Sequence, residues 1–128
     1  MLALDRGRAE AVEARLREWA DAEEALHAPE LLRYEAANAL GRAVAAGQLP
    51  AFEVTGAWQV ITAVPVTLHR LEDGPAVVSM TQRLERKSAY DAAYLVLADR
   101  LGADLWTLDG PLARNGGSRG LPVRLIEA

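Results

Sequence analysis

The sequence predicts a three-layer α/β/α fold in which a central parallel sheet is flanked by helices. Apolar residues recur at helical spacing in several segments, and short apolar runs separate those segments. Helices that alternate with short buried strands are typical of a parallel sheet covered on both faces. The chain has 128 residues, so we expect a single domain over residues 1–128.

The first half of the chain is predicted to contain three helices. Apolar positions spaced among Glu and Arg indicate the first helix, and the chain breaks at Pro29. Gly47 is a natural stop for the second helix, and Pro50 suits the first turn of the third. We expect helices over residues 8–26, 30–46 and 50–63, a strand fragment over 26–28 and a strand over 65–69.

The second half is predicted to contain three helices and two strands. Asp73 is a candidate N-cap for the first of these helices, and Ser88 for the second. The second is almost wholly apolar, so most of its circumference should be buried, and Gly102 ends it. We expect helices over residues 75–87, 90–101 and 110–114, strands over 103–108 and 123–126, and a loop over 115–120.

The composition restricts the possible functions. The absence of cysteine excludes a disulfide framework, a thiolate zinc site and a cysteine nucleophile. We expect a cytoplasmic protein without a membrane segment, because no uncharged apolar run approaches ~18 residues and the start lacks an apolar signal core. A net charge of −4 argues against a general nucleic-acid coat, but an enzyme with a carboxylate-bound metal can be acidic overall.

Three carboxylates lie where a surface-solubility role explains them poorly. Glu35 lies among apolar residues of its predicted helix, and Asn38 follows on the same face. Asp91 is in the first turn of the most apolar helix. Asp109 follows a strand at its carboxyl end, where ligands of parallel sheets bind.

Each carboxylate also has an ordinary structural explanation. Asp91 can simply favour its helix N-terminus, and Asp109 can be a helix N-cap. Glu35 can be an exposed residue paired with Arg33 or Arg42. The three together are more informative, because carboxylates in one cleft repel one another unless a cation neutralises them. All-oxygen ligands select Mg²⁺ or Mn²⁺, whose bound water can attack a phosphodiester.

Three segments resemble the successive motifs of the PIN-domain family, in the family's order and spacing. They are residues 27–40 (HAPELLRYEAANAL), 88–98 (SAYDAAYLVLA) and 107–109 (TLD). The similarity extends from the first helix to the last strand. The resemblance is to the VapC-like toxin ribonucleases within this family, and it implies a PIN-like fold.

The resemblance implies a metal-dependent endoribonuclease, the toxin of a toxin–antitoxin pair, that hydrolyses RNA with Mg²⁺ or Mn²⁺. Glu35, Asp91 and Asp109 would be the catalytic, metal-binding acids. Asn38 and Thr107 resemble the family's polar neighbours of those acids. It further implies an antitoxin partner, an RNA substrate and a homodimer.

Arg86 and Lys87 are candidates for RNA binding, because they immediately precede the helix that carries Asp91. The alternative is that they belong to a solvated helix face.

The sequence departs from the family at its N-terminus, where nothing matches the strand that carries the first acid. Asp5 is the only early Asp, and it lies beside Arg6 and Gly7 just before the first long helix. A central strand of the sheet is therefore missing from the prediction, and a gene start placed too far downstream is our leading hypothesis. The alternative function is a catalytically inactive PIN-like module that binds an antitoxin or RNA.

Overall fold

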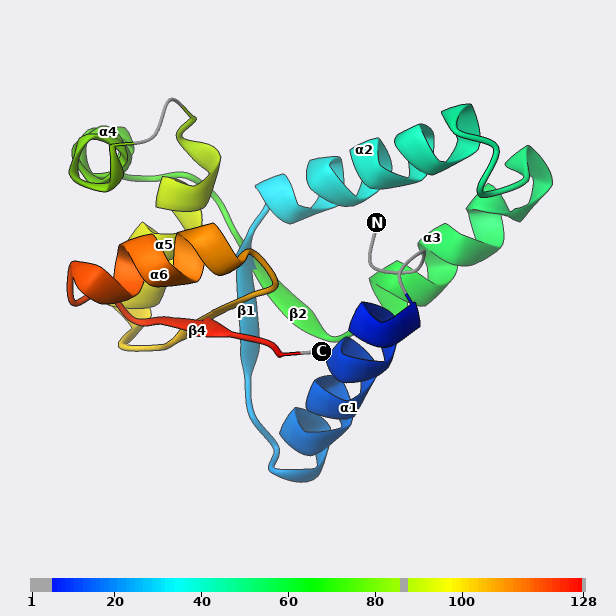
Figure 1. The fold of residues 1–128 in the computed structure, drawn as a ribbon, viewed down its shortest axis with the longest axis horizontal. Helices are drawn as coiled ribbons and strands as arrows, with labels where there is room; N and C mark the ends of the chain where they lie inside the picture. The colour runs from blue at the N-terminus through cyan, green and yellow to red at the C-terminus, as the bar shows by residue number, and fades with distance from the viewer. Residues whose placement is uncertain (1–5, 86–87, 128) are drawn as a thin grey trace. The chain divides into compact units, whose positions relative to one another are not determined.

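The structure is a computed structural model that describes residues 6–85 and 88–127 (Figure 1). The chain separates into two compact units, Met1–His69 (unit 1) and Arg70–Ala128 (unit 2). The helices are α1 (Arg6–Asp21), α2 (Leu31–Ala45), α3 (Val54–Ala63), α4 (Gly74–Leu84), α5 (Tyr90–Leu101) and α6 (Gly110–Ser118), with a 3-10 turn η1 (Ala51–Glu53) before α3. The strands are β1 (Leu26–Pro29), β2 (Val66–His69), β3 (Leu105–Thr107) and β4 (Val123–Leu125).

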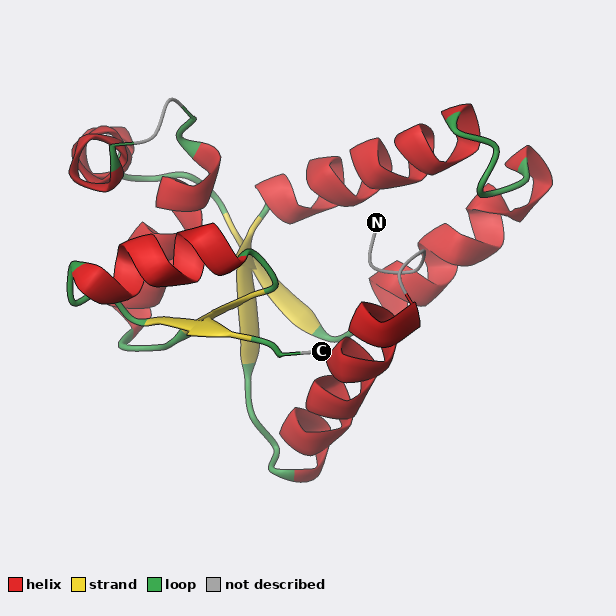
Figure 2. Cartoon of the chain, viewed as in Figure 1, coloured by secondary structure: helices red, strands yellow, loops and turns green. Residues whose placement is uncertain are grey.

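The α/β class predicted from the sequence is confirmed. In the described part of the chain, β1 pairs with β2 and β3 pairs with β4, and both pairs are parallel (Figure 2). Parallel neighbours need a crossover, which α2 and α3 supply in unit 1 and α6 supplies in unit 2. This arrangement is consistent with a three-layer α/β/α PIN-like fold. The single domain expected over residues 1–128 stays a prediction.

The first helix ends earlier than predicted. We expected it to continue to Leu26, but α1 ends at Asp21. Glu23 has a left-handed backbone with φ of 56°, and the N–H of Glu24 donates to the carbonyl of Trp19 at 2.8 Å, which closes the helix. Leu26 instead pairs with Val66 in the sheet, so the strand fragment expected at 26–28 is confirmed.

The second helix ends where its glycine predicted. Gly47 has a left-handed backbone with φ of 72°, which a residue without a Cβ adopts at little cost. The N–H of the next residue, Gln48, donates to the carbonyl of Ala43 at 2.9 Å and so completes the closing turn of α2. The chain then re-enters helix through η1 and α3.

Unit 2 has a hydrophobic core between α4 and α5. Leu84 of α4 and Leu95 of α5 are almost fully enclosed, at 1% and 0% exposure. Val77, Met80 and Ala92 complete the cluster. Burying a leucine side chain contributes about 1.5–3 kcal/mol. The expectation that the apolar α5 helix is largely buried holds for its inner face, whereas Tyr90 and Leu101 at its ends remain exposed.

The last helix is longer than predicted. We expected α6 to stop at Arg114 and a loop to follow, but the helix continues to Ser118. The side chain of Asn115 donates to the carbonyl of Leu84 at 2.9 Å and holds this turn in place. Gly116 is buried against Val123, where an added Cβ would lie 2.5 Å from Cγ2 of that valine. Packing against Val123 therefore explains the glycine at position 116.

Among the helices that the structure describes, none is long and apolar enough to cross a membrane.

Candidate functional site

Asp91 is held at the start of α5 in unit 2. It lies in the first turn of that helix and is partly buried. The predicted N-cap Ser88 lies one position too early, because the N-cap residue is Ala89. The hydroxyl of Ser88 accepts a hydrogen bond from the N–H of Tyr90 at 3.2 Å. The helix N-terminus carries a partial positive charge, which favours a carboxylate at this position.

Asp109 is fixed between β3 and α6. Its Oδ1 accepts from the N–H of Leu112 at 3.0 Å, which makes it the N-cap of α6. Its own N–H donates to Oγ1 of Thr107 at 3.0 Å, so the hydroxyl at the end of β3 orients the backbone of the acid that follows. Asp109 itself is exposed.

The chain topology brings Asp91 and Asp109 to the same end of unit 2. The helix α5 leads into β3 through the short connection 102–104, so it runs opposite to the strand that it precedes. Its N-terminus therefore lies toward the carboxyl end of β3, where Asp109 begins the next helix. The carboxyl ends of parallel strands are where such folds bind ligands.

Glu35 lies in unit 1, in the second turn of α2. It is exposed, and so is Asn38 one turn later. The helix α2 begins directly after β1, at the carboxyl end of the β1–β2 pair. Each candidate acid thus lies near the carboxyl end of the parallel strand pair in its own unit.

The donor chemistry of these residues fits a hard divalent ion. Carboxylates offer only oxygen ligands, which Mg²⁺ and Mn²⁺ prefer. Within residues 6–85 and 88–127, however, no three His, Asp or Glu side chains are grouped so as to hold a metal.

The RNA-binding candidates Arg86 and Lys87 lie outside the described residues. Their described neighbours have structural roles. Arg83 donates to the carbonyl of Arg119 at 3.2 Å, and Arg119 pairs with Glu85 at 3.4 Å.

A repeated tripeptide that the sequence reasoning missed bears on Asp109. The same Asp-Gly-Pro sequence begins both α4 and α6. Asp73 Oδ1 accepts from the N–H of Ala76 at 3.0 Å, the same capping bond that Asp109 makes with Leu112. Capping alone therefore explains the presence of an Asp at position 109, and an experiment must separate the cap from any catalytic role.

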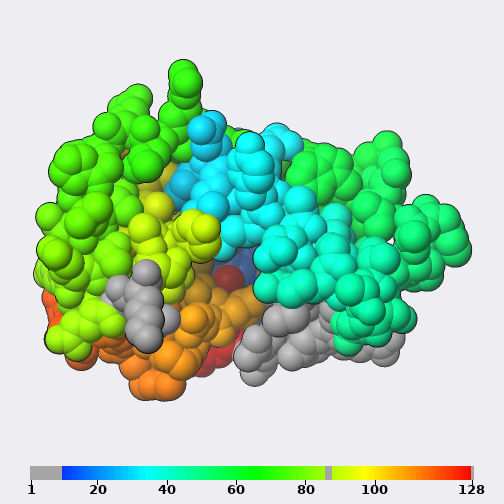
Figure 3. Space-filling view, turned by 90° about the horizontal axis from the view of Figure 1, so that it is seen from above, coloured from blue at the N-terminus to red at the C-terminus, as the bar shows by residue number. Residues whose placement is uncertain are grey.

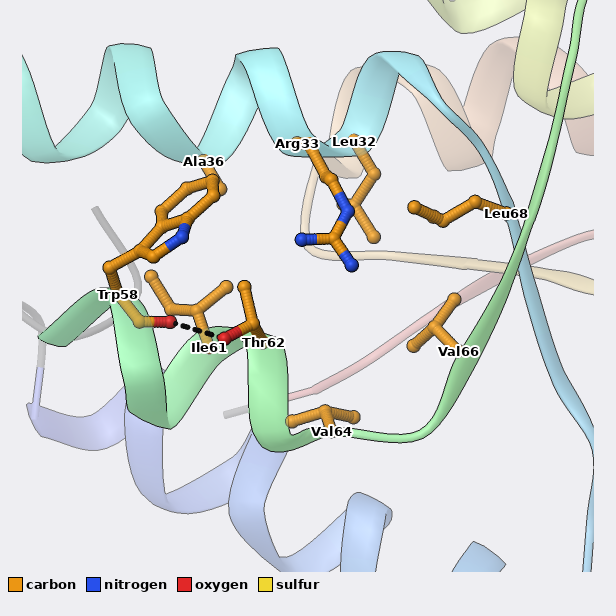
Figure 4. Close-up of a pocket in the computed structure, with 9 residues that line it drawn as sticks. All are labelled: Leu32, Arg33, Ala36, Trp58, Ile61, Thr62, Val64, Val66 and Leu68. Atoms are coloured by element: carbon orange, nitrogen blue, oxygen red, sulfur yellow. Dashed lines mark hydrogen bonds between the residues drawn. The ribbon is translucent and has the colours of Figure 1, made fainter.

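Unit 1 also has a small, open apolar groove (Figure 4). Side chains of α2, α3 and the β2 segment line it, and the guanidinium of Arg33 extends into it from α2. The lining residues are Leu32, Arg33, Ala36, Trp58, Ile61, Thr62, Val64, Val66 and Leu68. Its walls are hydrophobic with a single charged group, which suits an apolar ligand or side chain better than a phosphate.

Comparison with known proteins shows which family the chain belongs to. No protein-family model matches the chain. Two relatives are each 37% identical to it over 114 residues, which is 89% of this chain and 78% of the relative. Both are named Ribonuclease VapC3, from Mycobacterium tuberculosis strains CDC 1551 / Oshkosh and ATCC 25618 / H37Rv. The resemblance predicted from the three motifs is confirmed, and the chain belongs to the VapC-like toxin ribonucleases of the PIN-domain family.

Proposed function

We propose that this chain is a metal-dependent endoribonuclease, the toxin of a toxin–antitoxin pair, which hydrolyses RNA phosphodiesters. The observation that carries the proposal is the similarity to a named ribonuclease over 89% of the chain. The positions of Asp91 and Asp109 at one end of unit 2 support it, because hydrolysis of a phosphodiester needs groups that stabilise developing charge.

The proposed metal ligands are the carboxylates of Glu35, Asp91 and Asp109, and the proposed ion is Mg²⁺ or Mn²⁺. When bound, such an ion supplies an activated water and neutralises charge on the phosphate. Asp109 uses Oδ1 for its cap, which leaves Oδ2 as its proposed ligand atom. Thr107 positions Asp109 through its hydroxyl. Asn38 is proposed to act beside Glu35 by a polar contact with substrate or a bound water.

The repeated cap provides a matched test. Asn caps helices about as well as Asp, so Asp73→Asn and Asp109→Asn should each leave stability within about 0.5 kcal/mol of the parent. Of the two residues, only Asp109 is a proposed ligand. RNA cleavage in Mn²⁺ or Mg²⁺ should therefore fall on the order of 100-fold in Asp109→Asn, and by less than about twofold in Asp73→Asn. Cleavage should also stop in EDTA and in Asp91→Asn.

Other outcomes would contradict the proposal. Cleavage that persists in EDTA would exclude the metal. Equal losses in Asp73→Asn and Asp109→Asn would show that the carboxylate of Asp109 has no role in cleavage beyond that of its non-ligand counterpart Asp73. No cleavage by the folded chain with either ion, together with no metal binding in calorimetry, would favour the alternative, an inactive PIN-like module.

The proposed partners are a cognate antitoxin and a second copy of the chain, with RNA as the substrate and the cytoplasm as the location. Exposed apolar side chains on unit 1 support a protein partner: Tyr34, Phe52 and Val60 are 75%, 86% and 71% exposed. Figure 3 shows the surface of this region, with α2 in cyan and the chain toward α3 in green. Light scattering of the chain alone and with the neighbouring gene product would separate a homodimer from a toxin–antitoxin complex.

A further inference from the structure

Two histidines that are distant in the sequence meet on unit 1. His27 of β1 and His69 of β2 are 42 positions apart, and Nδ1 of the first lies 2.8 Å from Nε2 of the second. Their ring centroids are 5.1 Å apart and the rings are tilted by 43°. Two ring nitrogens at this distance share one proton, which either ring can donate.

The strand register explains why the rings meet. His27 pairs with Thr67 and Pro29 pairs with His69, so His27, Thr67 and His69 all project from the same face of the strand pair. Ala28 is on the opposite face and is buried at 5% exposure. The carbonyl of His69 also accepts from the N–H of Glu30 at 2.9 Å, which holds the end of β2 against the start of α2. The two rings are therefore presented from a fixed backbone.

The pair is open to solvent. His27 is exposed and His69 is half-buried, so an ion can reach the facing nitrogens without an opening of the fold. No third His, Asp or Glu joins them into a metal-binding group within the described residues, which leaves the remaining coordination positions to water.

A metal ion can replace the shared proton. Zinc–imidazole bonds are about 2.0–2.1 Å long, so two nitrogens on one tetrahedral ion lie roughly 3.3 Å apart. The present separation of 2.8 Å has to widen by only about half an ångström, which small rotations of the rings supply. Imidazole nitrogen suits Zn²⁺, Cu²⁺ and Ni²⁺, whereas Mg²⁺ prefers oxygen.

We propose that His27 and His69 form a two-histidine site for a divalent transition-metal ion of the Zn²⁺, Ni²⁺ or Cu²⁺ class, separate from the candidate carboxylates. An ion held there joins β1 to β2 and stabilises the strand pair of unit 1. Any ion that binds only the folded chain stabilises it in proportion to its concentration.

The test uses Zn²⁺ and the fact that the chain contains two histidines in all. Long-range ¹H–¹⁵N spectra of the intact chain report both rings and no other imidazole. Zn²⁺ should shift the ring nitrogens of both residues together and saturate at one equivalent, while Mg²⁺ at the same concentration should leave them in place. If the ring-nitrogen signals of both histidines do not move at millimolar Zn²⁺, the proposal is overturned, and this test needs no variant.

Variants provide a second readout. Zn²⁺ affinity in calorimetry should fall at least about tenfold in His27→Gln and in His69→Gln, because each removes one of the protein ligands. Asp73→Asn should keep the parental affinity, because Asp73 caps α4 and is a proposed ligand of neither site. Retained affinity in both histidine variants, or its loss in Asp73→Asn, would contradict the two-histidine site.

Discussion

Unit 1 and unit 2 each contain one parallel strand pair and a crossover, yet they bury different side chains. Unit 2 encloses Leu84 and Leu95 completely between two helices. In the described part of unit 1, the buried hydrophobic residues are the small side chains Ala28 and Ala43. Large apolar residues such as Phe52 and Val60 stay exposed there.

The difference indicates how the two units are stabilised. Unit 2 has an internal core of large side chains, which supplies most of the free energy that opposes conformational entropy. Unit 1 relies on half-buried contacts around its groove and retains apolar surface that another protein can cover. A surface of this kind marks an interaction site more often than a defect. Stability should therefore depend most on unit 2, and partner binding most on unit 1.

The largest expected effect is in the core of unit 2. Leu95→Ala should lower the free energy of unfolding by about 2–5 kcal/mol, because it leaves a cavity in a fully buried site. The same change at the exposed Leu71 should cost less than about 0.5 kcal/mol. In unit 1, Leu32→Ala at the half-buried groove should fall between the two. Denaturant titration measures all three, and a larger loss for Leu32→Ala than for Leu95→Ala would reverse the comparison.

The next effect concerns the two adjacent glycines of α6. Gly116→Ala should cost about 1–3 kcal/mol, because its Cβ would overlap Val123. Nothing lies within 4 Å of a Cβ built at Gly117, so Gly117→Ala should stabilise the helix by about 0.5–1 kcal/mol. In thermal unfolding, Gly116→Ala should lower the melting temperature of the chain and Gly117→Ala should raise it. If Val123→Ala does not reduce the cost of Gly116→Ala in the double variant, the steric explanation fails.

Local signals were sufficient to predict many of the element boundaries. Asp73 caps its helix as predicted, and Gly47 and Gly102 each end a helix with a left-handed backbone. These features depend on a few consecutive residues, so their chemistry can be read from the sequence. The predictions failed where a distant residue decides. Leu26 leaves the helical pattern because Val66 pairs with it, and α6 continues because Gly116 packs on Val123.

The candidate site shows the same limit. The motifs located Glu35, Asp91 and Asp109, and the alternative prediction that Asp109 is a helix N-cap is confirmed by the same bond that Asp73 makes. The histidine pair was not predicted, because His27 and His69 are 42 positions apart in the sequence. Only the register of β1 against β2 brings them within 2.8 Å.

Hydrogen exchange tests whether the two units open separately. Amides of α5 should exchange only on global unfolding, because their helix packs in the core of unit 2. Amides of β1 and β2 should exchange at least about tenfold faster, which corresponds to an opening free energy lower by roughly 1.4 kcal/mol. Equal protection in both units would mean that they unfold together, despite their different burial.

The smallest expected effect compares one threonine from each unit. The hydroxyl of Thr107 accepts a hydrogen bond from the N–H of Asp109. The hydroxyl of Thr62 instead donates a hydrogen bond to the carbonyl of Trp58 within its own helix. Thr107→Val should cost about 1 kcal/mol, because it removes the bonding partner of a backbone donor. Thr62→Val should change stability by less than about 0.5 kcal/mol. A helical Ser or Thr hydroxyl that donates to the carbonyl four residues earlier adds little to the stability of the helix.

RNA cleavage separates the roles of the same two threonines. If Thr107 orients a catalytic acid, Thr107→Val should lower cleavage more than its small loss of stability explains, and Thr62→Val should leave cleavage unchanged. Equal activity in the two folded variants would mean that the hydroxyl of Thr107 serves only the turn between β3 and α6. That result would leave Asp109 as a helix cap whose orientation does not affect chemistry.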